Sequence, residues 1–178
     1  MQSQPSTWIK CKAVVISVLW LAAVALLLSW SWQAQLQPFD ETRRLHTTAQ
    51  LSTQVEQWLS QHDIPTLQSA MVHLQRRSCG CDLRAHGHRA ELSAKVQAEG
   101  GRVYTVELGD EQPAWLPAVP AVILFDATGA MIYLGPYAEG AFCSPASSFV
   151  ESLLPALFDT RMPATWLNSD AVGCYCEI

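Results

Sequence analysis

A long uncharged and mostly apolar stretch near the N-terminus constrains this chain more than any other feature. Residues 13–32 read AVVISVLWLAAVALLLSWSW, and no charged residue occurs between Ala13 and Phe39. A helix of this length rises about 30 Å, which matches the hydrocarbon core of a bilayer. The stretch therefore predicts a transmembrane helix over residues 13–32. Because it exceeds the ~7 to 15 apolar residues of a cleaved signal peptide, an uncleaved anchor is favoured.

The charges that flank this stretch indicate its orientation. Lys10 and Lys12 lie on the short N-terminal side, although Arg43 and Arg44 on the far side weaken the asymmetry. Because basic residues favour the cytoplasmic side, we expect residues 1–12 to form a cytoplasmic tail. The rest of the chain would then face the periplasm. This predicts a single-pass protein of the bacterial inner membrane.

Length and charge limit what the remainder can be. The chain has 178 residues and a net charge of −5, which suits one ordinary domain and gives no general attraction for phosphate backbones. We therefore expect no nucleic-acid partner. The pattern of apolar residues divides the exported part into three segments: a helical linker over 33–64, a domain over 65–160 and a C-terminal extension over 161–178.

Hydrophobic periodicity predicts alternating helices and strands in this part. An amphipathic helix over 42–61 is followed by a buried strand over 69–74, a helix over 81–97 and a strand over 102–108. A hairpin of strands 118–126 and 131–134 comes next, and a closing helix over 147–158 ends the domain despite Pro155. This order indicates an α/β domain.

Three features of the domain together resemble the thioredoxin superfamily. The pair Cys79-Gly80-Cys81 directly follows an apolar strand at a helix start, Val119-Pro120 stands forty residues after Cys79, and the hairpin sequence FDATGAMIYLGP comes next. The resemblance covers residues 65–158 and implies a thioredoxin-like three-layer α/β/α domain with a mixed central sheet. It also implies a cis bond at Val119-Pro120, with Pro120 beside the active-site cysteines; such a bond costs only ~0.5 to 1 kcal/mol.

The cysteine motif departs from the Cys-x-x-Cys of thioredoxins by one residue. Two Cα atoms two residues apart in a helical turn lie about 5.5 Å from each other, so a Cys79–Cys81 disulfide is geometrically allowed. The small ring would strain the bond and make it more oxidising. We expect Gly80 to relieve part of that strain, because glycine admits backbone angles that other residues avoid.

The start of a helix favours thiolate chemistry. Backbone N–H groups and the helix dipole lower the pKa of a cysteine placed there. Cys79 is accordingly assigned as the attacking thiol and Cys81 as the resolving thiol. Arg84 adds positive charge nearby, whereas Asp82 opposes it. No separate cofactor is needed, because the cysteine pair is itself the redox group.

Two other functions remain open on the same residues. Cys79, Cys81, His86 and His88 carry the sulfur and imidazole ligands that suit copper or zinc, which would make the chain a metal-delivery protein. On a helix, however, His88 lies two turns, about 10 Å, from Cys81, so the four ligands do not converge easily. A structural or interaction module without catalysis is the other reading.

The C-terminal sequence GCYCEI repeats the Cys-x-Cys motif at Cys174 and Cys176. Three arrangements fit: a disulfide to Cys143, a second redox pair that exchanges electrons with Cys79 and Cys81, or a four-sulfur metal site made by both pairs. The sequence does not choose among them. We expect a membrane-anchored thiol-disulfide oxidoreductase whose partners are exported protein thiols and a membrane or periplasmic redox protein.

Overall fold

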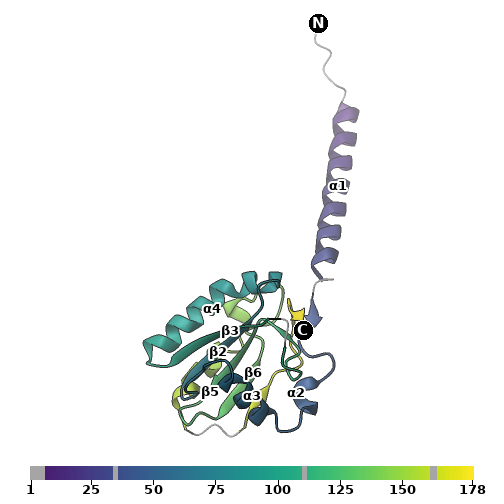
Figure 1. The fold of residues 1–178 in the computed structure, drawn as a ribbon. Helices are drawn as coiled ribbons and strands as arrows, with labels where there is room; N and C mark the ends of the chain where they lie inside the picture. The colour runs from purple at the N-terminus through teal and green to yellow at the C-terminus, as the bar shows by residue number, and fades with distance from the viewer. Residues whose placement is uncertain (1–6, 34–35, 110–111, 161–163) are drawn as a thin grey trace. The chain divides into compact units, whose positions relative to one another are not determined.

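The computed structural model describes residues 7–33, 36–109, 112–160 and 164–178 (Figure 1). The chain divides into two compact units, Met1–Gln35 and Leu36–Ile178. The first unit contains helix α1 (Thr7–Gln33), and within it Lys12–Ser31 has a mean hydropathy of 2.5 with no part of the span buried. Among the described residues this is the one helix long and apolar enough to cross a membrane, as the sequence predicts.

The second unit is built on a mixed five-stranded sheet, which confirms the predicted α/β class. The strand order is β3-β2-β5-β6-β7, with β2 parallel to β3, β6 parallel to β7, and the central pairs antiparallel. The strands are β2 (Ala70–Gln75), β3 (Arg102–Glu107), β5 (Ala121–Phe125), β6 (Met131–Gly135) and β7 (Trp166–Leu167). The strands predicted at 69–74, 102–108 and 131–134 therefore lie within one or two residues of the observed ones.

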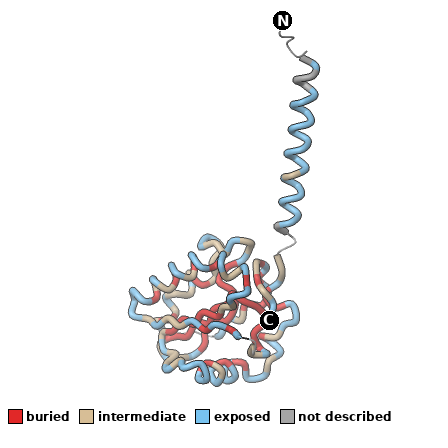
Figure 2. The backbone as a smooth tube through the Cα atoms, turned by 45° about the horizontal axis from the view of Figure 1, so that its top comes forward, coloured by how far each residue is buried: buried red, intermediate tan, exposed pale blue. Residues whose placement is uncertain are grey.

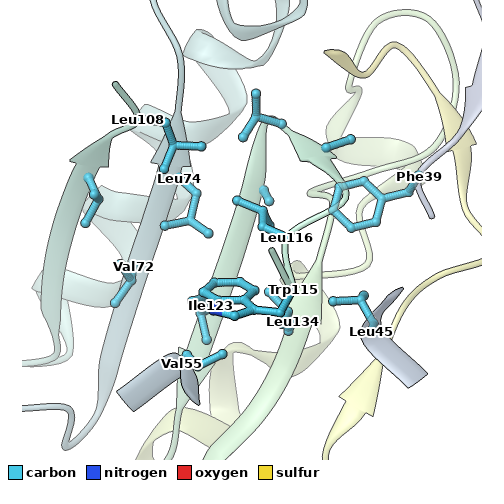
Figure 3. Packing of buried hydrophobic residues seen from close by; sticks show 14 of the residues in the cluster. Phe39, Leu45, Val55, Val72, Leu74, Leu108, Trp115, Leu116, Ile123 and Leu134 are labelled. Carbon is cyan, nitrogen blue, oxygen red and sulfur yellow. The ribbon is translucent and has the colours of Figure 1, made fainter. Parts of the chain in front are cut away.

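Helices pack on both faces of this sheet because β2 sends alternate side chains to opposite sides. Val72 and Leu74 join one buried cluster with Val55 of helix α3 (Leu51–Ser60) (Figure 3). Met71 joins a second cluster with Leu92 of helix α4 (Gly80–Ala98). Figure 2 shows in red the buried parts of the backbone in the second unit. Each fully buried side chain of this size contributes about 1.5–3 kcal/mol. The helices are α2 (Arg44–Thr47), α3 (Leu51–Ser60), α4 (Gly80–Ala98), η1 (Pro145–Ser147) and η2 (Glu151–Phe158).

The segment expected to be a linker, residues 33–64, contributes to the core of the second unit from Leu36 onward. The predicted helix over 42–61 is split into α2 and α3, because Gln50 adopts a left-handed conformation with φ 51°. Leu45 of α2 and Leu59 of α3 are both buried in the same cluster. The break thus lets two short helices cover one face of the sheet, where a single straight helix was expected.

The predicted closing helix over 147–158 is also different in the structure. It consists of two 3₁₀ helices, η1 and η2, and Pro155 lies inside the second. Proline has no N–H to donate and its ring clashes with the preceding turn, which disfavours a continuous α-helix. Leu157 is fully buried, while Phe149, Leu153 and Leu154 are partly buried against the second cluster.

Short strand pairs attach both ends of the second unit to it. The strand predicted over 118–126 is interrupted at Pro120, which leaves β4 (Ala118–Val119) separate from β5. β4 pairs antiparallel with β9 (Cys176–Glu177), and β1 (Gln37–Pro38) pairs antiparallel with β8 (Val172–Gly173). The residues expected to form a C-terminal extension, 161–178, are therefore built into the domain over their described part, 164–178.

Candidate functional site

Two cysteines stand at the start of helix α4, which follows directly on strand β2. Cys79 is the N-cap residue, with the extended backbone angles φ −93° and ψ 112°, and its N–H donates to the Arg76 carbonyl at 2.9 Å. Cys81 lies in the first turn. Both cysteines stand at the N-terminus of a 19-residue helix. Its first N–H groups and its dipole therefore favour negative charge on both sulfurs. This is the predicted order of strand, cysteine pair and helix.

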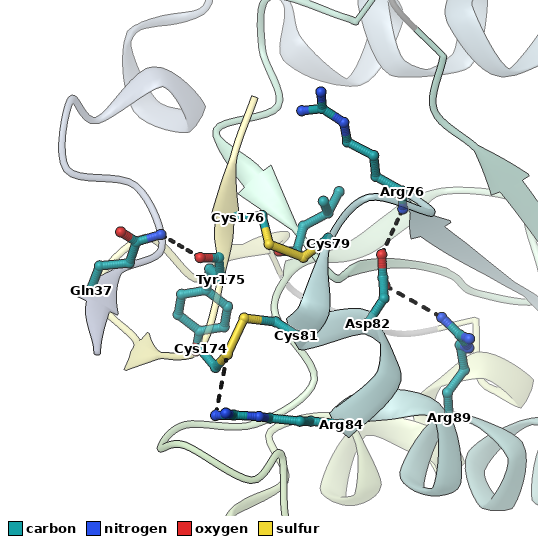
Figure 4. Close-up of a disulfide and its surroundings, with 11 residues drawn as sticks. Gln37, Arg76, Cys79, Cys81, Asp82, Arg84, Arg89, Cys174, Tyr175 and Cys176 are labelled. Atoms are coloured by element: carbon teal, nitrogen blue, oxygen red, sulfur yellow. Dashed lines mark hydrogen bonds and ion pairs between the residues drawn. A yellow bond between two sulfur atoms is a disulfide. The ribbon is translucent and has the colours of Figure 1, made fainter. Parts of the chain in front are cut away.

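Each cysteine of this pair is joined to a cysteine of the C-terminal segment. Cys79 is bonded to Cys176 and Cys81 to Cys174 (Figure 4). The bond expected within the pair, between Cys79 and Cys81, is absent. The structure thus assembles the two Cys-x-Cys segments, separated by more than ninety residues, into one centre of four sulfurs.

Strand pairing explains why the cross-connection forms. Val119 of β4 lies opposite Cys176 of β9, and the Val119-Pro120 bond is cis, as the resemblance implies. The Cys79 sulfur lies 3.7 Å from the Val119 carbonyl oxygen. The bend at Pro120 therefore lies against Cys79, and pairing with β4 delivers Cys176 to the same place.

Tyr175, between the two tail cysteines, fixes the tail by contacts that involve no sulfur. Its hydroxyl donates to the Ala138 carbonyl at 2.9 Å, and its ring meets that of Phe39 edge to face at 5.2 Å between centroids. The Gln37 side-chain amide donates to the Tyr175 carbonyl. Tyr175 is buried, so the tail is packed into the domain as well as bonded to it.

The two disulfides differ in exposure and in charged neighbours. Cys79 is only 4% exposed, whereas Cys81, Cys174 and Cys176 are partly exposed. The Arg84 guanidinium nitrogen Nη1 lies 3.7 Å from the Cys174 sulfur and also donates to the Ala141 carbonyl at 3.2 Å. A thiolate at Cys174 would therefore be stabilised by a fixed positive charge. The Cys81–Cys174 bond is the more accessible of the two.

A small pocket beside Cys79 contains a carboxylate in an unusual environment. Asp82 lines it together with Leu83, His86 and Arg89. Burial raises the pKa of the Asp82 carboxyl, against the hydrogen bond from the Arg76 N–H at 2.6 Å and the charge of Arg89. The Arg89 Nη1 and Asp82 Oδ1 atoms are 3.6 Å apart, an ion pair without hydrogen-bond geometry.

The two histidines considered as metal ligands do not join the sulfurs. His86 is exposed, whereas His88 is buried and its Nε2 lies 2.9 Å from the Ser148 hydroxyl. Within the described residues, the one group of histidine, cysteine and carboxylate ligand atoms close enough to share a metal consists of Cys79, Cys81 and Cys176. The ligand set of Cys79, Cys81, His86 and His88 is therefore not assembled here.

Cys143 is not part of the centre. It carries a free thiol, so the arrangement with a Cys143 disulfide is not formed. Burial raises the pKa of this thiol to about 11, which keeps it protonated and unreactive at neutral pH. Of the three arrangements left open by the sequence, the one with a Cys143 disulfide is not formed, and the two Cys-x-Cys segments are instead joined to each other by two disulfides.

Several residues of the site could not be identified from the sequence. The roles of Phe39, Gln37 and Tyr175 depend on pairings between the two ends of the domain, and no local pattern marks them. Arg84 was noted for its charge near the helix start, but its contact with Cys174 depends on the position of the tail. The repeated Cys-x-Cys motif was the one available signal for the cross-connection.

Adjacent disulfides at a helix start can exchange with each other and with outside thiols. The sulfurs of Cys79, Cys81 and Cys176 all lie within 4.8 Å of one another. A thiolate released from one disulfide therefore has a sulfur of the other within a short side-chain movement. Thiol-disulfide exchange proceeds by such an attack, and no metal or cofactor is required for it.

One family model matches most of the chain. It is described as Domain of unknown function (DUF6436), and the match covers residues 47–178, more than half of the 178 residues. No curated protein and no solved structure matched the chain. The matched range contains both Cys-x-Cys segments and the strand pair β4 and β9 that brings them together. The chain therefore belongs to the DUF6436 family.

Proposed function

We propose that this protein is a membrane-anchored thiol-disulfide oxidoreductase with a thioredoxin-like domain, acting on exported proteins from the periplasmic side of the bacterial inner membrane. One observation carries the proposal: both Cys-x-Cys segments meet at the first turn of α4, cross-joined as Cys79–Cys176 and Cys81–Cys174.

The arrangement of the elements supports the thioredoxin-like assignment. The cysteine-bearing helix α4 connects the parallel strands β2 and β3, and the cis bond at Val119-Pro120 enters the antiparallel strands β5 and β6. Helices pack against both faces of the sheet. The apolar helix α1 supports a membrane anchor, and Lys12 at the start of its apolar span supports a cytoplasmic N-terminus.

We assign the first step to the Cys81–Cys174 bond, because it is more exposed than the bond of Cys79. A substrate thiolate attacks the Cys174 sulfur, and the S–S bond breaks with Cys81 leaving as a thiolate at the helix start. The sequence had suggested Cys79 as the reacting thiol. We now assign the first reaction to Cys174 and Cys81. The second thiolate of the substrate then attacks the substrate-side sulfur of the mixed disulfide. The substrate leaves with an internal disulfide, and Cys174 is released as a thiolate beside Arg84.

These two steps balance in electrons and protons. The substrate dithiol becomes a disulfide, Cys81 and Cys174 become thiols, and two electrons and two protons move from substrate to protein. The same steps in reverse reduce a substrate disulfide. Internal exchange follows when the Cys81 thiolate attacks the Cys79–Cys176 bond, which lies within reach. One S–S bond breaks and one forms, so the thiolate moves from Cys81 to Cys79 or Cys176 and no added oxidant is needed.

The test is oxidation of a reduced model substrate by the full chain in detergent micelles. The oxidised protein is mixed with an unfolded secreted polypeptide that has two thiols, and the loss of both is followed by maleimide labelling. We expect Cys81→Ser and Cys174→Ser to lower the rate at least about tenfold, because each removes one partner of the entry disulfide. Cys143→Ser is the matched control and should keep the wild-type rate, since Cys143 is outside the centre.

Two outcomes would overturn the proposal. One is a wild-type protein whose disulfides do not react with substrate thiols in the folded state and open only after denaturation, which would indicate a structural module. The other is full activity in both Cys81→Ser and Cys174→Ser, which would place the redox centre elsewhere. A mixed disulfide between Cys174 of Cys81→Ser and an oxidised substrate, formed by the reverse of the assigned step and not resolved because Cys81 is missing, would support the assignment directly.

A further inference from the structure

We propose that the reduced protein binds one zinc ion through the four sulfurs of Cys79, Cys81, Cys174 and Cys176. Disulfide formation and zinc binding use the same sulfurs and therefore exclude each other. This inference does not depend on exchange with substrates. It rests on the positions of the sulfurs, on the contacts that keep the tail in place without the disulfides, and on the charges around the centre.

Three of the four sulfurs already lie near one another, as a four-sulfur site requires. In a tetrahedral Zn–S₄ site with bonds of about 2.3 Å, neighbouring sulfurs lie roughly 3.8 Å apart. The sulfurs of Cys79, Cys81 and Cys176 are all within 4.8 Å of one another, and the Cys174 sulfur is bonded to that of Cys81. The Cys174 sulfur is outside this group of three, so after the two S–S bonds break Cys174 is the side chain that must move furthest to reach tetrahedral spacing.

The tail is held where it is by contacts that survive reduction. The Ile178 N–H donates to the Pro117 carbonyl at 3.2 Å, and the Arg44 guanidinium donates to the Ile178 carbonyl at 3.0 Å. The Cys174 N–H donates to the Gly140 carbonyl at 3.2 Å, and Tyr175 remains buried against Phe39. These contacts lie on both sides of the two cysteines, so the four thiols stay together after the disulfides open.

The surroundings favour a cluster of thiolates around a cation. Four thiolates and one Zn²⁺ carry a net charge of −2. The first turn of the 19-residue helix α4 and the guanidinium of Arg84 near Cys174 both stabilise negative charge there. Four thiolates without an imidazole form the donor set of a closed structural zinc site, with no position left for water.

The oxidation state of the four cysteines decides whether zinc can bind. A disulfide sulfur has no thiolate to donate, so the oxidised centre has no zinc ligands. Four electrons and four protons from a thiol or phosphine reductant convert the two disulfides into four thiols. Zinc binding then releases the thiol protons to solvent, so metal affinity rises with pH.

The test compares oxidised and reduced full-length protein in detergent micelles. After anaerobic reduction with a phosphine and its removal, the protein is mixed with Zn²⁺, passed through a desalting column and analysed for bound metal. We expect one zinc per reduced chain and none per oxidised chain. Bound zinc should protect Cys79, Cys81, Cys174 and Cys176 from alkylation, and substitution with Co²⁺ should give the intense visible bands of tetrahedral sulfur coordination.

Variants identify the ligands separately from any loss of folding. Cys174→Ser and Cys176→Ser should each weaken zinc binding by at least about tenfold, because even the loss of a hydrogen-bonding partner of a ligand costs about 10–100-fold in affinity, and each should alter the Co²⁺ spectrum. Cys143→Ser should keep one zinc with the wild-type affinity. The near-ultraviolet circular dichroism of each reduced variant shows whether the domain is folded, so a folded variant with weaker binding supports the site.

Three results would overturn the proposal: no zinc on the folded, reduced wild-type protein, equal zinc on the oxidised and reduced forms, or unchanged binding in both Cys174→Ser and Cys176→Ser. Binding of Cu⁺ to three of the sulfurs with no affinity for Zn²⁺ would also contradict it. Oxidation of substrate dithiols by the metal-free protein is measured independently, so failure of the zinc site leaves the proposed redox function standing.

Discussion

Cys79 is bonded to Cys176, 97 residues further along the chain, although Cys81 stands only two residues away. The cause is the antiparallel pairing of β4 with β9, which sets Cys176 opposite Val119, whose carbonyl oxygen is 3.7 Å from the Cys79 sulfur. The second bond joins Cys81, two residues after Cys79, to Cys174, two residues before Cys176. The two disulfides together make the C-terminal residues part of the candidate site.

Gly173 tests whether the packing of the tail controls formation of the disulfides. A Cβ at this position would lie 2.6 Å from the Tyr175 hydroxyl oxygen and 3.0 Å from the Gly140 carbonyl oxygen. We expect Gly173→Ala to destabilise the docked tail by about 1–3 kcal/mol, as overpacking commonly does. In a fixed glutathione buffer, this variant should contain a smaller fraction of tail-linked protein than the wild type, measured by mass spectrometry.

Gly80→Ala is the matched control, although the sequence suggested that Gly80 is needed for its flexibility. Gly80 begins helix α4, and a Cβ there would meet nothing within 4 Å. Alanine is the better helix former by up to ~1 kcal/mol. Both disulfides should form as in the wild type. Equal loss of the tail linkage in both variants would show that Gly173 has no special packing role.

The two disulfides should contribute unequally to stability. A bond that closes a loop of about 100 residues stabilises by roughly 4–5 kcal/mol, whereas a second bond two residues inside the first closes a very small additional loop worth about 2 kcal/mol. The double variant Cys81→Ser/Cys174→Ser should therefore lower the free energy of unfolding by about 2 kcal/mol. Urea unfolding, followed by tryptophan fluorescence, measures this; complete reduction of the wild type should lower it much further.

Acid should destabilise the domain through His73. Burial, and secondarily the charge of Arg89, lower the pKa of His73 to about 3, and its ring nitrogens lie at hydrogen-bonding distance from Tyr137 and Ser93. Because the unfolded state takes up this proton near pH 6.5, stability is present above that pH and is lost as pH falls from 6.5 towards 3. The slope approaches about 1.4 kcal/mol per pH unit for one proton.

The measurement is the free energy of unfolding between pH 7 and 5, in the wild type and in His73→Gln. The variant keeps a donor and an acceptor but cannot be protonated, so its profile should be flatter. His86→Gln, a histidine replaced at an exposed position, is the matched control variant. An identical slope in His73→Gln and the wild type would show that another group governs the acid response.

Cys143 should be alkylated slowly in the native protein. Burial raises its thiol pKa from 9.0 to about 11, which reduces the thiolate fraction at pH 8 by about 100-fold. We expect iodoacetamide to label Cys143 readily only after denaturation. Rapid labelling of the folded protein at pH 8 would contradict this account of the residue.

The sequence predicted the elements whose pattern is local. Periodicity predicts the apolar helix, the strands at 69–74 and 102–108 and the cysteine-bearing helix. The cis bond before Pro120 was predicted from a resemblance. The break at Gln50 and the 3₁₀ geometry around Pro155 depend on how the chain fits the sheet. The disulfide pattern was beyond prediction, because a strand pair between β4 and the last residues leaves no periodic signal in two-residue strands.

A disulfide map of the full chain tests the central claim most directly. Arg77, Arg84 and Arg161 place the four cysteines in two tryptic peptides, 78–84 and 162–178. We expect these peptides to be linked to each other in oxidised protein and to separate, without unfolding of the domain, as the glutathione buffer becomes more reducing. Two unlinked peptides, each with its own internal disulfide, or a link that opens only on denaturation, would contradict it.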